Sequence, residues 1–250
     1  MSALRRYHRV SREFGNSLIL TAPIFVLYQI GILFTDGWRN GVDLFSGPVM
    51  RLLGGSLLGY TVLNLLILGV FVGLYLKRRE ERTLDGRTWA LLIVESTAWA
   101  VVMGLFAGNL LFQLGFRPPL AAGLEAIPAA TGLPAMGVFD AFVLSLGAGA
   151  WEELFFRLIL LGGMLWGFRR LGWRPWVALA TALVLSSVIF SAFHYVPIGM
   201  ESWQVWSFMF RFVLGIFLGV LYLWRGFAVA VYAHAIYDIL ILVPRAIVGG

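Results

Sequence analysis

Long apolar runs separated by short polar or basic segments dominate the pattern of this chain. A bilayer core of about 30 Å is crossed by about 20 apolar residues in a helix. Each run that fits this length is expected to be helical, because exposed strand edges do not occur in lipid. The predicted spans are 17–35, 57–76, 89–114, 138–167, 176–197, 203–224 and 227–244. The pattern therefore predicts an all-α polytopic membrane helix bundle with about seven transmembrane helices (six to eight).

The composition supports this class of protein. Hydrophobic residues make up 60% of the chain and charged residues only 13%, whereas soluble domains are about one quarter charged. The absence of cysteine excludes disulfides, iron–sulfur clusters and cysteine-ligated zinc. The net charge of +6 lies mostly in short segments between spans, so no nucleic-acid partner is expected. The first apolar run is longer than a signal-peptide core and lacks a cleavage site, so it is interpreted as a retained helix.

The basic residues also predict an orientation. Of 19 Lys and Arg residues, 13 lie in segments that the predicted spans place on one side, four lie on the other and two lie within spans. The positive-inside rule then puts the N-terminus in the cytoplasm and the C-terminus outside. No internal repeat is evident, and residues 1–250 are interpreted as a single integral membrane domain. The proline-rich segment 115–137 is expected to be an external loop or a short interfacial helix. The expected location is the cell (inner) membrane of a prokaryote.

Ionisable residues inside spans are candidates for function, since each costs several kcal/mol in lipid. Glu95 is expected to pair with an arginine on a neighbouring helix. Arg211 is expected to pair with an internal carboxylate, and binding an anionic part of a ligand is the alternative.

Span four carries three charged residues, in the sequence "GAGAWEELFFRLILLGG". Glu153 and Arg157 are four residues apart on one helix face, with the acid first, and are expected to pair. Glu152 lies about 100° further round and has no obvious local partner. A buried carboxylate without a partner is suited to act as a general base. The alternative is that both glutamates only hold helices together.

Two of the three histidines lie in or beside spans, His194 in "VIFSAFHYVPIG" and His234 in "AVYAHAIYDILIL". A single histidine in an apolar span is more often a packing residue than a catalyst. His234 and Asp238, however, share one helix face, and both need a polar interior. We expect this interior to contain Glu152 and Arg157 and to hold a water.

Together, EExxxR (Glu152, Glu153, Arg157), FxxxH (Phe190, His194) and HxxxD (His234, Asp238) resemble the motifs of the CPBP family, which includes the type II CAAX prenyl endopeptidases. The order and spacing of the three motifs agree over about residues 138–243, and the additional helices at 17–114 precede them. The resemblance implies an intramembrane endopeptidase of the glutamic type that requires no metal. Its substrate would be a peptide or a membrane protein within the lipid bilayer.

The resemblance also implies roles for the motif residues. Glu152 and His194 would activate a water, His234 and Asp238 would stabilise the oxyanion, and Glu153 with Arg157 would shape the site. Related enzymes commonly carry Asn where this chain has Asp238. An aspartate donates a hydrogen bond only when protonated, and an ionised Asp238 would instead orient His234.

The predicted spans place the motif residues at different depths in the membrane, which argues against one common site. At a rise of 1.5 Å per residue, Glu152 and His194 are expected roughly 24–27 Å from the cytoplasmic boundary, and His234 only about 10 Å from it. Tilted or broken helices would close this gap, and so would different span boundaries.

Three other functions fit the same residues. Two histidines and three carboxylates could hold zinc in a metal-dependent membrane protease (a metalloendopeptidase), although no HExxH is present. Buried Glu, His and Asp also form proton relays in transporters. A third possibility is a non-catalytic membrane scaffold or immunity protein.

Overall fold

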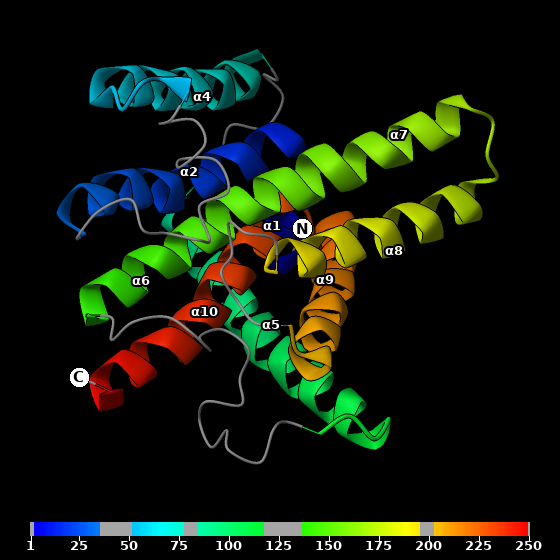
Figure 1. The fold of residues 1–250 in the computed structure, drawn as a ribbon. Coiled ribbons are helices and arrows are strands. Elements are labelled where there is room, and N and C mark those ends of the chain that lie inside the picture. The colour runs from blue at the N-terminus through cyan, green and yellow to red at the C-terminus, as the bar shows by residue number, and fades with distance from the viewer. Residues whose placement is uncertain (1–2, 36–51, 78–84, 118–136, 196–202, 250) are drawn as a thin grey trace.

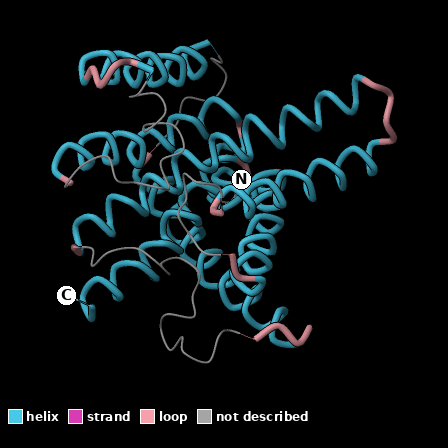
Figure 2. Tube along the Cα trace, in the orientation of Figure 1, coloured by secondary structure: helices cyan, strands magenta, loops and turns pink. Residues whose placement is uncertain are grey.

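The computed structural model describes residues 3–35, 52–77, 85–117, 137–195 and 203–249, and helices account for nearly all of them (Figures 1 and 2). The all-α prediction is therefore confirmed. In chain order the helices are α1 (Ala3–Arg12), α2 (Phe14–Gly31) with the short 3₁₀ turn η1 (Ile32–Phe34), α4 (Leu57–Lys77), α5 (Gly86–Gln113), α6 (Val138–Gly147), η4 (Ala148–Leu161), α7 (Gly162–Arg170), α8 (Pro175–Phe193), α9 (Val205–Arg225) and α10 (Phe227–Gly249).

Six of the seven predicted spans each form a helix long and apolar enough to cross a membrane. The seventh consists of α6, η4 and α7, which follow one another without a break from Val138 to Arg170 and form one long rod (Figure 1). The N-terminal basic segment, for which no helix was predicted, forms α1. The predicted loop at 115–137 lies almost entirely outside the described residues.

Local sequence signals explain several helix boundaries. Asp85 caps α5 by accepting a hydrogen bond from the backbone N–H of Thr88 at 2.8 Å, as expected for an aspartate at this position. Pro175 occupies the first turn of α8, where its missing N–H costs nothing. Gly226 alone separates α9 from α10 and has φ of +100°, a conformation that glycine adopts most readily.

Helix α10 is the centre of the bundle and packs against α2, α5, α6, η4 and α9. Its most apolar window is 61% buried inside the protein, whereas that of α4 is 17% buried. Helix α4 packs chiefly against α2 and lies at the edge of the molecule (Figure 1). The polar residues of α10 are thus surrounded by protein.

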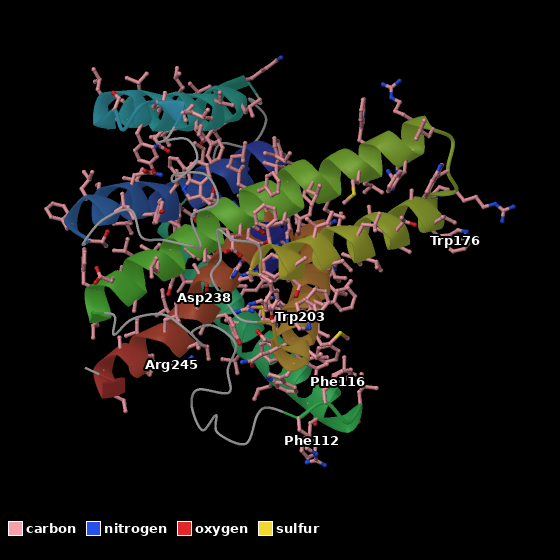
Figure 3. The ribbon with its side chains drawn as sticks, viewed as in Figure 1. Phe112, Phe116, Trp176, Trp203, Asp238 and Arg245 are labelled. Carbon is pink, nitrogen blue, oxygen red and sulfur yellow. The ribbon has the colours of Figure 1, made fainter. Side chains whose placement is uncertain are left out.

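Helices α7 and α8 form an antiparallel hairpin that extends well beyond the other helices (Figure 1). Trp176 lies near the outer end of this hairpin (Figure 3). Within α7, no residue is buried. The hairpin is therefore a projecting element, and its tip does not mark the level at which the other helices end.

Candidate active site

Both glutamates of the first motif lie on η4, which is a π-helix and not the α-helix that the spacing argument assumed. Glu152 is 3% exposed and Glu153 is fully buried. π-helical segments are rare and occur frequently at functional sites. The wider turn does not abolish the predicted pair: Nε of Arg157 lies 3.2 Å from Oε2 of Glu153.

His234 of α10 lies among three carboxylates. Its Nδ1 is 2.7 Å from Oε1 of Glu153, which is a hydrogen bond. Its Nε2 is 3.9 Å from Oε2 of Glu152 and 3.7 Å from Oδ2 of Asp238. Asp238, also on α10, lies beside the long rod near the centre of the molecule (Figure 3). The structure therefore brings the first and third motifs together.

The close approach of η4 and α10 depends on Gly149. A Cβ atom added there would lie 2.7 Å from the carbonyl oxygen of Val231 and 2.6 Å from Cβ of Ala235. Both distances are too short for a side chain, so only glycine fits. No role for Gly149 was predicted from the sequence, although the small residues of "GAGA" just before the glutamates are typical of close helix packing in membranes.

Oε2 of Glu152 has no hydrogen-bond partner among the described residues. This agrees with the expectation that Glu152 lacks a local partner. The two terminal nitrogens of Arg157 are likewise without a hydrogen bond within the described part of the chain. The Arg157 guanidinium instead lies over the ring of Phe190, 4.4 Å from its centroid, a cation–π contact.

The second motif approaches from α8. His194 follows the last residue of this helix, and its Nδ1 lies 3.0 Å from the carbonyl oxygen of Phe190. The Phe190 ring packs edge-on against the rings of both His194 and His234, with centroids 5.3 and 6.1 Å apart. Within the described chain, no hydrogen bond joins His194 to Glu152. Phe190 is therefore the side chain that connects the two imidazoles.

The expected difference in depth between Glu152 and His234 is wrong. It assumed that the α7–α8 tip and the α9–α10 turn lie at the same level, whereas the hairpin projects further. Helix α10 also begins inside the protein: the backbone N–H of Ala228 donates a hydrogen bond of 2.6 Å to Oγ of Ser17. Seven residues into α10, His234 is consequently level with Glu152.

Glu95 lies apart from this site and has the partner that was predicted for it. Arg225 contacts both carboxylate oxygens, with Nε 2.5 Å from Oε1 and NH2 2.7 Å from Oε2. Arg225 is 1% exposed and is the last residue of α9, so it does not belong among the 13 basic residues that the predicted spans placed in segments on one side. Without it the basic residues still divide twelve to four.

Arg211 is buried on α9, and its NH1 donates hydrogen bonds to Oγ of Ser207 at 2.6 Å and to the Tyr195 hydroxyl at 3.2 Å.

In the part of the chain that the structure describes, no group of three or more His, Asp or Glu side chains is arranged to hold a metal ion.

Comparison with known proteins supports the resemblance. The family model described as type II CAAX prenyl endopeptidase Rce1-like matches residues 134–240. No curated protein and no solved structure gives a significant match. The matched range contains all three motifs, from Glu152 to Asp238. The match at residues 134–240 of this multi-helix membrane protein therefore supports a CAAX protease-like family, a family of membrane proteases.

Proposed function

We propose that this protein is an intramembrane endopeptidase that hydrolyses a peptide bond with a water activated by Glu152 and His194. The observation that carries the proposal is the position of His234. Glu153 accepts from Nδ1 of this ring, and Nε2 is directed at Glu152 and Asp238. A carboxylate that fixes an imidazole in one orientation is a recurring arrangement in hydrolytic sites.

In the proposed reaction, the water oxygen attacks the carbonyl carbon while Glu152 accepts a proton from the water. The tetrahedral intermediate carries its negative charge on the former carbonyl oxygen, where His234, and Asp238 if protonated, would donate hydrogen bonds. When the C–N bond breaks, the proton passes from Glu152 to the leaving amine. One water is consumed, and one new carboxyl terminus and one new amino terminus are formed.

The remaining motif residues would hold this geometry. Arg157 compensates the charge of Glu153 and lies over Phe190, and Phe190 packs against both imidazoles. Because Nδ1 of His194 is next to the carbonyl of Phe190, Nε2 is the atom that would contact the water. Exclusion of bulk water by the surrounding helices strengthens such electrostatic interactions.

The test is cleavage by the purified protein in liposomes, with peptides that carry a prenylated C-terminal cysteine and unmodified peptides as two substrate arms. We expect Glu152→Gln to lower the rate by about a hundredfold or more, since a general base contributes about 10²–10⁴. Asp140→Asn, on the same rod, is the matched control. Cleavage by Glu152→Gln at the wild-type rate would contradict the proposal.

Two further measurements separate the alternatives. Loss of activity in chelator, restored by zinc, would indicate a metal-dependent protease. An unchanged set of protein termini in membranes from cells with wild type and Glu152→Ala, together with loss of solute uptake in the variant, would indicate a transporter.

A further inference from the structure

Arg211 is a buried cation that none of the three motifs includes. It lies on α9, is 6% exposed and is close enough to His194 and Asp238 to interact electrostatically with both. A buried charge is costly in a membrane protein and is retained where it has a role. Its contacts with neighbouring side chains show which part of the site it touches.

The first contact joins α9 to the residue directly after His194. NH1 of Arg211 donates to the Tyr195 hydroxyl at 3.2 Å, and its guanidinium carbon lies 5.7 Å from the centroid of the Tyr195 ring. The same NH1 donates to Oγ of Ser207 at 2.6 Å. Ser207 is four residues earlier on α9, so this bond fixes the direction of the arginine along its own helix.

A second contact holds the same end of α8. Oγ of Ser191 donates a hydrogen bond of 2.6 Å to the carbonyl oxygen of Phe208 on α9. Further along, Gly215 lets the helices approach closely, because a Cβ there would lie 3.0 Å from Cβ of Ser187. Helix α9 therefore contacts α8 at Ser187 and Ser191, before the turn that carries His194, and at Tyr195 within that turn.

His194 needs such support because it lies beyond the last helical residue of α8. Its backbone N–H is 3.4 Å from the carbonyl oxygen of Ser191, which is long for a hydrogen bond. Helix ends also fray more readily than helix interiors. A catalytic imidazole at such a position has to be held by another element, and the described residues offer α9.

We infer that Arg211 is a positioning residue that fixes the His194-bearing turn of α8 against α9 through Tyr195. The inference rests on the proposed function, since it assigns His194 to the reaction. In this role Arg211 acts through His194 and not on the substrate. Displacement of a catalytic group lowers kcat more than it weakens substrate binding.

The first experiment is a double-mutant cycle. We expect Arg211→Gln to lower kcat about tenfold to a hundredfold with KM changed less than about threefold, and Arg211→Lys to recover part of the loss. Tyr195→Phe should show a smaller loss of the same kind. In a His194→Ala background, Arg211→Gln should have almost no further effect, because the group that it positions is absent. The inference would be overturned if Arg211→Gln lowered kcat by the same factor in the wild-type and His194→Ala backgrounds, or if it changed KM alone.

A second readout needs no catalysis. Hydrogen exchange of the backbone amides at 191–195 should become faster in Arg211→Gln and remain unchanged in Arg87→Gln, an exposed control at the start of α5. Unchanged exchange at 191–195 in Arg211→Gln would refute the positioning role. If the wild-type protein cleaves no peptide, the proposed function fails, and the exchange experiment still decides whether Arg211 fixes this turn.

Discussion

Glu153 is the residue on which the site is built, since each of its carboxylate oxygens faces a different partner. Oε2 faces Nε of Arg157 at 3.2 Å, and Oε1 accepts from Nδ1 of His234 at 2.7 Å. Oε2 of Glu153 and Oε2 of the adjacent Glu152 both lack a hydrogen bond among the described residues. The Glu153 oxygen, however, lies 3.2 Å from Nε of Arg157, whereas the Glu152 oxygen lies 3.9 Å from Nε2 of His234. Two neighbouring glutamates therefore have different surroundings, and Glu153 is held more closely than Glu152.

Removing Arg157 tests how much this arrangement stabilises the protein. Arg157→Gln should lower the free energy of unfolding by about 3–5 kcal/mol, because it leaves Glu153 as a buried charge without its compensating cation. The measurement is denaturant or thermal unfolding of the purified protein in detergent. Arg169→Gln, an exposed arginine of the same rod, should change stability little. Equal losses of unfolding free energy in the two variants would show that the Arg157–Glu153 pair stabilises the protein no more than an exposed arginine does.

At the scale of elements, the contact between η4 and α10 determines whether the site forms. Gly149→Ala would place a methyl group against the backbone of α10 at Val231. Overpacking of this kind costs about 1–3 kcal/mol, and separating the helices would move His234 away from Glu152 and Glu153. We expect cleavage to fall at least tenfold, a loss larger than the change in stability alone explains.

The matched control for this substitution is Gly167→Ala in α7. A Cβ at Gly167 meets nothing within 4 Å, so alanine should leave cleavage unchanged and favour the helix slightly. Wild-type activity in Gly149→Ala would contradict the close approach of η4 and α10.

A second contact between elements ties α1 to the bundle. The Tyr7 hydroxyl donates to Oε2 of Glu95 on α5, and Glu95 also pairs with Arg225 at the end of α9. Burial raises the pKa of Tyr7 far above its ordinary value, with the bond to Glu95 acting in the same direction. The phenol therefore stays protonated at neutral pH and donates its hydrogen bond to Glu95.

Tyr7→Phe removes this donor and keeps the ring. A hydrogen bond to a charged group contributes about 1.5–3 kcal/mol, so the free energy of unfolding should fall by roughly this amount. The protein that remains folded should cleave at the wild-type rate. Tyr75→Phe on α4 is the control. If Tyr7→Phe abolished cleavage without changing stability, Tyr7 would belong to the reaction and not to the fold.

Across the whole molecule, the sequence predicted what depends on local spacing and missed what depends on how helices cross. The Glu153–Arg157 and His234–Asp238 pairs follow from a separation of four residues on one helix. Glu95 and Arg225 are 130 residues apart, so the sequence indicated a need for an arginine but not which one. The depth of His234 could not be predicted, because it depends on the projecting α7–α8 hairpin and on the start of α10 inside the protein.

The orientation of the whole molecule in the membrane is the remaining prediction. Twelve basic residues on one side and four on the other predict a cytoplasmic N-terminus. The chain contains no cysteine, so single cysteines can be introduced at exposed positions without other changes. Arg117→Cys and Val248→Cys should react with a membrane-impermeant maleimide on intact cells. Leu4→Cys and Arg169→Cys should react only after the cells are opened, and the reverse pattern would show that loop charge does not set the orientation of this bundle.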